Sequence, residues 1–380
     1  MRRYFPGLLL LPVLLPALLA QADDKQRLEL SGRVFVDGDY YESFWSSEGD
    51  DSSRSVELRN ARLEMNYDFP RGWNGKLQVN ASADQDDSDL GYGSVYMRYT
   101  KWKPADITLG RMKEPVGMEL NTGSSKLQTI ERSMMTDAFT AGKSWGVHLF
   151  DANNKRRWAL ALVMEDDQDG DYDRYDETGY DDLPVAVAGR YTLSPINTDE
   201  QTLQLGISAT VRDWRENTFR IASRGEVSGA DRVVRSAEFE ADSQAVVGFE
   251  GLYRLGGWQV QGEYMATRVA EVAGPDWDYS GYYVTGSYLF GAQQRRFRKG
   301  EFRRLKPESG AWELVARYSY LDARQRGLGS VAAVSTVGVN YYANEKLRLM
   351  LAFLHPDISG SVRHADPDGN AVSARLQLNF

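Results

Sequence analysis

Apolar and polar residues alternate in short segments along this chain, and the pattern continues to its last residue. In the final segment, 371–380, every second residue is apolar: Val372, Ala374, Leu376, Leu378 and Phe380. Successive side chains of a β-strand point to opposite faces, so one face of this segment requires an apolar surrounding and the other requires water. Segments of about ten residues with this pattern are typical of strands that cross a bilayer at a tilt.

Sixteen segments of this kind can be counted, and single-chain outer-membrane barrels have an even number of strands. We therefore predict an all-β fold, a transmembrane antiparallel up-and-down β-barrel of sixteen strands. The segments centre on residues 28–40, 56–69, 76–83, 94–102, 106–112, 144–150, 157–164, 185–193, 202–212, 245–255, 258–267, 281–290, 311–321, 335–342, 347–354 and 371–380.

The connectors between these segments alternate between short turns and long acidic stretches, which is the known asymmetry of such barrels. The long acidic connectors are 42–53, 84–90, 165–182, 213–243 and 356–369. Several tryptophans lie next to the short turns and predict an aromatic girdle at one membrane interface. They are Trp73, Trp102, Trp158, Trp258 and Trp312. A soluble β-sandwich would show the same alternation, but it rarely needs so many strands.

Residues 1–22 have the features of a secretory signal peptide, which leaves residues 23–380 as one barrel domain. Arg2 and Arg3 precede an apolar stretch, and Ala20-Gln21-Ala22 forms a small-x-small cleavage site. The apolar stretch, broken by Pro12 and Pro16, is shorter than the ~20 residues that a spanning helix needs.

Composition excludes several other classes of function. The chain has no cysteine, so it has neither a disulfide framework nor a thiolate metal site, and we expect no cofactor. Its formal net charge of −9 argues against nucleic acid as a partner, because binding phosphates requires a basic surface. We expect the outer-membrane lipid and lipopolysaccharide to surround the barrel.

The alternation also predicts which charged residues line the lumen. In the first, second and fourth segments it places Arg33, Arg62 and Arg98 on the inward face. The face changes near Arg59, which indicates a β-bulge and leaves the orientation of Arg59 open.

Two connectors carry a basic pattern that could set ion selectivity. The first runs from Lys113 to about Lys143 and could fold inward, where Lys113, Lys126 and Arg132 would form a positive ring. Alternatively, it is a solvated loop whose charges are cancelled by three glutamates, Glu114, Glu119 and Glu131.

The second basic connector, 291–310, lies by parity on the periplasmic side, where turns should be short. It carries two glutamates, Glu301 and Glu308, and seven cations: Arg295, Arg296, Arg298, Lys299, Arg303, Arg304 and Lys306. Either this turn hangs free in the periplasm, or it folds into the lumen and presents its cations to solutes.

Three sequence blocks resemble the phosphate-selective porin family, porins O and P. The first block is Leu109-Gly110-Arg111-x-Lys113-x-Pro115-x-Gly117-x-Glu119 with Ser124-Ser125 and Glu131-Arg132. The other two are Arg59 to Glu64 and Gly310 to Asp322. The resemblance covers essentially the whole chain after the signal peptide.

This resemblance implies a trimeric channel of the Gram-negative outer membrane, narrowed by an inward loop that carries a lysine. The lysine corresponds here to Lys126. It also implies a ladder of arginines, to which Arg215, Arg220 and Arg224 of connector 213–243 would contribute, and a periplasmic turn in the lumen, which corresponds to 291–310 with Arg303.

The predicted function is therefore passive diffusion of small anions, with phosphate or polyphosphate as the leading solutes. However, connector 165–182 holds ten acidic residues and only Arg174 as a cation, so a general or cation-favouring porin stays an alternative. A barrel-embedded hydrolase would need one of three histidines, His148, His355 or His364. The run Asp167-x-Asp169-Gly170-Asp171-x-Asp173 could bind calcium, although it departs from the EF-hand spacing.

Overall fold

The computed structural model of the chain describes residues 27–42, 45, 52–83, 88–165, 183–291, 295–307, 310–360 and 369–380. The predicted signal peptide, the run 167–173, most of connector 165–182 and His364 lie outside these residues. The long strands are β1 (Arg27–Glu42), β2 (Ser52–Phe69), β3 (Trp73–Ala83), β4 (Ser88–Tyr99), β5 (Asp106–Lys113), β6 (Lys143–Ala152), β7 (Arg156–Met164), β8 (Val185–Asn197), β9 (Gln201–Asp213), β13 (Phe239–Leu255), β14 (Trp258–Glu271), β15 (Trp277–Leu289), β18 (Ala311–Asp322), β19 (Ser330–Tyr342), β20 (Leu347–Gly360) and β21 (Ala371–Asn379).

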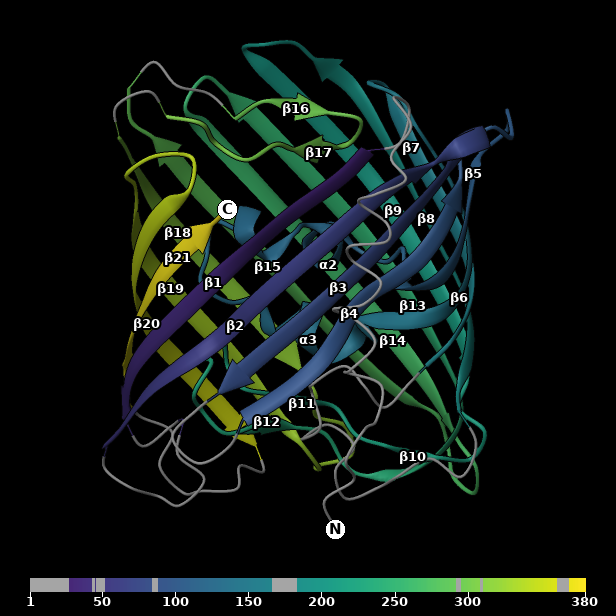
Figure 1. Ribbon diagram of the computed structural model, residues 1–380. Helices are drawn as coiled ribbons and strands as arrows, with labels where there is room; N and C mark the ends of the chain where they lie inside the picture. Colours follow the sequence, from purple (N-terminus) through teal and green to yellow (C-terminus); the bar gives the residue numbers. More distant parts are fainter. Residues whose placement is uncertain are drawn as a thin grey trace.

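These strands form one closed antiparallel barrel of 16 strands, as the alternation predicts (Figure 1). Closure depends on β1, which pairs with β2 on one side and with β21 on the other. The last residue completes the seam, because Gly32 and Phe380 exchange two backbone hydrogen bonds of 2.8 and 3.0 Å. The barrel therefore has no open edge along its wall, which a bilayer requires.

The alternation of side chains is confirmed in the strands that close the barrel. In β21, Leu376 and Leu378 are 43% and 41% exposed, whereas Arg375 between them is 4% exposed. The neighbouring β20 repeats this pattern, with Leu349 outside and Met350 inside. The apolar face thus meets the lipid, and the buried face meets other parts of the chain in the lumen.

The predicted change of face in the second strand is a β-bulge. Phe35 of β1 lies opposite Asn60 of β2, but Asp37 lies opposite Glu57, so two residues of β1 span three of β2. Val36 therefore faces both Leu58 and Arg59, and this one extra residue of β2 lets the alternation restart in the opposite phase. Arg59 faces the lumen, since its guanidinium donates to Glu131 at 3.2 and 3.3 Å.

The short turns gather at one end of the barrel, which we take as the periplasmic end. The β2–β3 turn is the three-residue η3 (Pro70–Gly72), in which Gly72 has a φ of +88°. Aromatic pairs at this end form the predicted girdle. They are Trp73 with Tyr99, Trp258 with Tyr288, and Trp312 with Tyr341.

At the other end, some strands continue further than the alternation predicts. β20 extends to Gly360, so residues 356–360 of the expected connector 356–369 belong to the strand. The prediction was wrong there because Pro356 and Gly360 are turn-forming residue types. Pro356 is tolerated at the outer end of this strand, where it lies opposite Val334.

Three segments of connector fill part of the lumen, and we name them by position. The inward loop, 114–142, contains α2 (Met118–Asn121), η4 (Ser124–Lys126) and α3 (Met134–Phe139). The mouth loop, 214–238, contains β10 (Thr218–Phe219), β11 (Ala222–Ser223) and β12 (Val234–Arg235). The basic turn, 290–310, contains β16 (Phe297–Arg298) and β17 (Glu301–Phe302). No helix of the described residues is long and apolar enough to span a bilayer.

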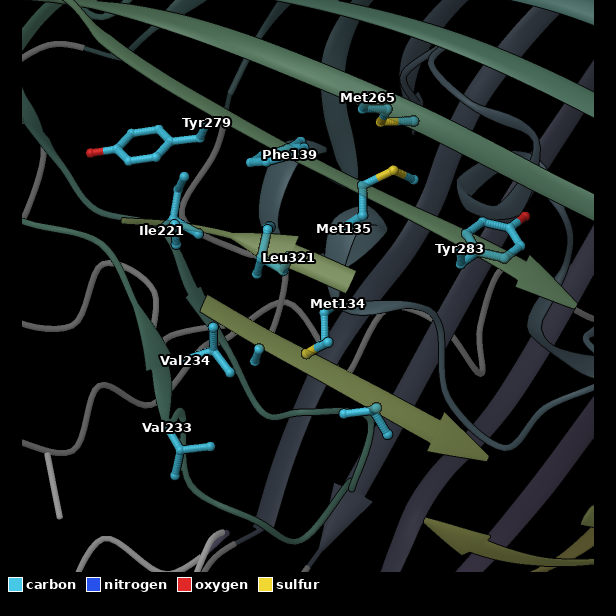
Figure 2. Close-up of a cluster of buried hydrophobic side chains, with 14 of the residues drawn as sticks. Met134, Met135, Phe139, Ile221, Val233, Val234, Met265, Tyr279, Tyr283 and Leu321 are labelled. Atoms are coloured by element: carbon cyan, nitrogen blue, oxygen red, sulfur yellow. The ribbon is translucent and has the colours of Figure 1, made fainter. Parts of the chain in front are cut away.

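The inward loop and the mouth loop share an apolar core inside the barrel (Figure 2). Met134, Met135 and Phe139 of α3 lie against wall residues such as Met265, and against Ile221 and other apolar residues of the mouth loop. Met134, Met135, Ile221 and Met265 are all fully buried. This core fixes both loops in the lumen, so neither is a solvated surface loop.

Candidate functional site

The inward loop is fixed to the wall by arginines that bind its three glutamates. Arg212 of β9 donates to Glu114 at 2.9 Å, and Arg317 of β18 donates to Glu119. Arg375 of β21 binds Glu131 at 2.6 Å. These arginines are almost fully buried. The loop is therefore not the solvated loop of the alternative, although Glu119 and Glu131 also lie near Arg132.

A buried carboxylate of β14 also holds the first turn of the inward loop. Glu263 accepts backbone hydrogen bonds of 2.6 Å from both Met118 and Glu119, and a further one of 2.7 Å from the Tyr283 hydroxyl. Gly117 makes this approach possible, because its φ is +66° and a Cβ atom there would lie 2.7 Å from a Glu263 oxygen.

Four of the predicted cations come together beside the inward loop, and we call them the lumen cations. They are Arg33, Arg62, Lys113 and Arg132. Lys113 lies close enough to the other three for electrostatic repulsion between their charges. They come from β1, β2, β5 and the inward loop, so only the tertiary fold brings them together.

Each of the lumen cations donates at least one hydrogen bond to a neutral acceptor. Arg33 donates to the side-chain oxygen of Asn60 at 2.9 Å, and Arg62 donates to that of Asn80 at 2.6 Å. Lys113 donates to the backbone carbonyl of Thr122 at 3.1 Å.

Arg132 also donates to backbone carbonyls, those of Glu119 at 3.2 Å and Thr122 at 3.1 Å. Burial lowers the pKa of Arg132, while the carboxylates of Glu119 and Glu131 favour its charged form. A guanidinium stays protonated at neutral pH in either case. Four like charges thus lie together here, with the carboxylates of Glu64, Glu119 and Glu131 near them.

Arg98 lines the lumen nearer the periplasmic end, as predicted. It donates to the Thr108 hydroxyl at 3.1 Å, and its guanidinium lies 5.1 Å from the ring centroid of Tyr96 and 5.8 Å from that of Phe150. The backbone partner of Thr108 on the next strand is His148, which is 4% exposed.

The basic turn folds into the lumen, which decides between the two alternatives for residues 291–310. Arg295 is buried and binds Glu313 of β18 at 2.7 Å. At the tip of the turn, Glu301 binds Arg157 of β7 and lies 3.8 Å from Lys126 of the inward loop. Burial lowers the pKa of Lys126, and the charge of Arg303 lowers it further, whereas Glu301 raises it.

The mouth loop narrows the opposite, extracellular end of the lumen. It leaves the wall at β9 and β13 and reaches β1, where the Tyr41 hydroxyl donates to the Gly229 carbonyl at 2.8 Å. The Trp45 indole donates to the Gly225 carbonyl at 3.3 Å. On a third side, the backbone N–H of Arg235 donates to the Ser330 hydroxyl at 2.9 Å.

The predicted arginines of the mouth loop make contacts within that loop. Arg220 donates to Glu238 at 2.9 Å, and Arg224 donates to the backbone carbonyl of Ser228 at 3.0 Å. Their part in a ladder of arginines stays a prediction. Arg303 of the basic turn is exposed.

Sequence reasoning missed the arginines that position the inward loop, Arg212, Arg317 and Arg375. The available signal was their inward position in the strand alternation, which Arg33 and Arg62 share. The partner of each arginine could not be predicted, because Arg317 and Glu119 are separated by 198 positions in the chain.

Two further predictions concern histidines and metals. His355 faces outward on β20 and contacts the side chain of Asn370 at 2.9 Å. Within the described parts of the chain, no group of three or more His, Cys, Asp or Glu side chains is placed to hold a metal ion.

A closed barrel with a loop folded into its lumen and charged side chains along the pathway is the architecture of an outer-membrane porin. The chain belongs to the phosphate-selective porin O and P family, whose model matches residues 29–380. It forms a channel in the outer membrane. A search of curated protein sequences finds no match.

Solved porin structures share this fold at low sequence identity. An anion-selective porin from Comamonas acidovorans is 13% identical, with a TM-score of 0.60 over 93% of this chain and 100% of its own. The outer membrane channel DcaP of Acinetobacter baumannii is 10% identical, with a TM-score of 0.60 over 94% of this chain and 99% of its own. The trimer form of OmpT from Vibrio cholerae is 10% identical, with a TM-score of 0.57 over 94% and 100%.

Proposed function

We propose that this porin passes small anions by passive diffusion, with phosphate or polyphosphate as the leading solutes. The observation that carries the proposal is the division of cations in the lumen. The arginines of the wall bind the glutamates of the inward loop, whereas Arg33 and Lys113 donate to neutral oxygens. We infer that the four lumen cations together outweigh the nearby carboxylates of Glu64, Glu119 and Glu131, and so attract anions.

The same geometry explains how a solute would move. An anion that enters the narrowed lumen loses part of its hydration, and guanidinium and ammonium donors replace it. The fork of a guanidinium fits two oxygens of a phosphate, so Arg33, Arg62 and Arg132 suit an oxyanion better than a halide. Binding must stay weak enough for release, and no bond is made or broken. We therefore propose a channel and not an enzyme.

We further propose that the chain assembles as a homotrimer within outer-membrane lipid and lipopolysaccharide. The support is the family resemblance and the fold shared with OmpT of Vibrio cholerae, which is described in a trimer form. Analytical ultracentrifugation of the detergent-solubilised protein, corrected for bound detergent, measures this directly; a monomer would contradict it.

The function is tested by the reversal potential of the purified porin in a planar bilayer under a KCl gradient, followed by phosphate titration. We expect a chloride-selective potential and a current that phosphate blocks at millimolar or lower concentration. Lys113→Gln should reduce both effects. Lys103→Gln, at an exposed lysine of the β4–β5 turn, is the matched control and should change neither.

A cation-selective channel is the opposite outcome of this test. A potassium-selective potential without phosphate block would contradict the proposal. It would mean that the acidic connectors at the channel entrance, and not the lumen cations, control which ions enter.

A further inference from the structure

One carboxylate of the basic turn lies between two cations that come from other parts of the fold. An Nη1 group of Arg157, on the inward face of β7, donates to one oxygen of Glu301. The other oxygen of Glu301 lies 3.8 Å from the ammonium of Lys126, in η4 of the inward loop. Wall, inward loop and basic turn therefore meet at a single carboxylate.

The hairpin β16–β17 is built to hold Glu301 in this place. Its two tip residues, Lys299 and Gly300, have φ values of +53° and +77°, which is typical of a two-residue type I′ turn. Phe297 and Phe302 pack edge to face across the hairpin, with ring centroids 5.1 Å apart.

The tip of the hairpin docks on the opposite part of the wall. The backbone N–H of Lys299 donates to the side chain of Asn154, in the β6–β7 turn, at 3.3 Å. Gly300 lies directly against Arg157, since a Cβ atom at this glycine would be 3.0 Å from Cδ of Arg157. The position of Glu301 thus follows from backbone geometry as well as from charge.

The surroundings of Glu301 remain accessible and basic. Side-chain exposures are 33% for Glu301, 25% for Lys126 and 18% for Arg157, so ions in the lumen can reach all three. Burial opposes the ionisation of Glu301, but Arg157 and Lys126 outweigh it and hold the pKa of Glu301 below its ordinary value. Glu301 is therefore a carboxylate at neutral pH.

A small pocket lies next to this site, beside the periplasmic turns. Its lining includes Ser125 and Lys126 of the inward loop, Arg304 of the basic turn and Lys346 of the β19–β20 turn. Further cations therefore lie next to Lys126, and Glu345 is the acidic residue of the lining.

We infer that Lys126 and Arg157 form a binding site for an oxyanion of the phosphate class, and that Glu301 occupies it as a tethered competitor. A carboxylate offers its two oxygens much as a phosphate does, so a passing anion must displace Glu301 to bind both cations. The consequence is that the anion binds more weakly here and is released faster on the periplasmic side. This inference rests on the proposed passage of anions.

The test is phosphate block of the chloride current through full-length Glu301→Gln porin in planar bilayers. An uncharged glutamine frees the cation pair. If the carboxylate occupies the site about nine-tenths of the time, the apparent inhibition constant for phosphate should fall about tenfold. Asp151→Asn is the matched control, because Asp151 belongs to a more exposed periplasmic ion pair, 3.7 Å from Arg156. Its inhibition constant should equal that of the wild type.

A double variant, Glu301→Gln with Arg157→Gln, separates competition from a mere change of shape. It should lose the tighter block, because the binding site itself is then incomplete. The inference is overturned if the inhibition constant for phosphate is the same in Glu301→Gln and Asp151→Asn. It is also overturned if the double variant keeps the lower inhibition constant of Glu301→Gln. Wild-type reversal potential is recorded in the same experiment. A cation-selective wild type would contradict the proposed function, whereas an anion-selective wild type with an unaltered Glu301→Gln would contradict only the tethered competitor.

Discussion

At the scale of single residues, arginine has two different roles in this lumen, and its acceptor decides which. Arg317 and Arg375 bind buried carboxylates and hold the inward loop in place. Arg33 donates to an amide oxygen and lies beside the other lumen cations. Both types occupy inward positions of strands, so the alternation alone does not distinguish them.

Glu131 illustrates the positioning role and its dependence on pH. Burial opposes its ionisation, but Arg59 and Arg375 outweigh this and hold the pKa of Glu131 below its ordinary value. A lowered carboxylate pKa stabilises the fold above the unfolded pKa of about 4.3, and this stability is lost as pH falls through the lowered folded value. We therefore expect the contribution of Glu131 to the free energy of unfolding to be constant from pH 7 to pH 5, as measured by the difference between the wild type and Glu131→Gln.

Glu131→Gln should lower the free energy of unfolding by about 1–3 kcal/mol, because it leaves two guanidinium groups with a weaker partner. Urea unfolding of the purified porin in detergent measures this loss. Glu345→Gln, at an exposed glutamate that binds Lys306, is the control. Equal stability of the two variants would mean that Glu131 does not hold the inward loop.

Gly117 carries the second prediction at this scale. An alanine there would combine a φ of +66° with Cβ contacts of 2.5 Å to Met265 and 2.7 Å to Glu263. We expect Gly117→Ala to cost roughly 1–3 kcal/mol and to alter the conductance, because the first turn of the inward loop must move. Gly286→Ala is the control, since nothing lies within 4 Å of a Cβ atom at that position. Unchanged stability and conductance in Gly117→Ala would contradict the prediction.

At the scale of elements, the pathway is formed by connectors that the wall positions. Lys126 belongs to η4 and contacts β17, so its neighbourhood depends on two connectors at once. Lys126→Glu would place a second carboxylate beside Glu301. We expect the anion preference to weaken or reverse, as measured by the reversal potential under a KCl gradient. Lys103→Glu provides the charge-matched control, and equal selectivity in both variants would remove Lys126 from the pathway.

The hairpin β16–β17 gives another test at this scale. Replacing residues 297–302 by a Gly-Ser linker removes the tip that docks on Asn154 and Arg157. We expect the single-channel conductance to rise, since the hairpin lies across the periplasmic part of the lumen (Figure 1). A hairpin that hung outside the barrel would leave the conductance unchanged.

At the scale of the whole molecule, the chain is net acidic and encloses the lumen cations. Charges on exposed connectors are screened over about 10 Å at 0.1 M salt and about 3 Å at 1 M, whereas partly buried charges are screened less. We therefore expect the permeability ratio of chloride to potassium to rise between 0.1 and 1 M KCl, because salt removes the acidic contribution first. A ratio that falls over this range would mean that salt screens the lumen cations more than it screens the acidic connectors.

The sequence by itself determined the wall of this barrel and much of its lining. Strand alternation is a local property with a period of two residues, and one face must meet lipid. It therefore placed sixteen segments and the inward faces of Arg33, Arg62 and Arg98 correctly, and it located the bulge at Arg59.

Only the tertiary structure decided what fills the lumen. The contacts of Glu119 with Arg317 and of Glu301 with Arg157 join residues separated by 198 and 144 positions. No local pattern specifies such pairs, because the conformation of a connector depends on the surface against which it packs. The wall therefore follows from periodicity, whereas the pathway follows from the way in which the closed barrel confines its own loops.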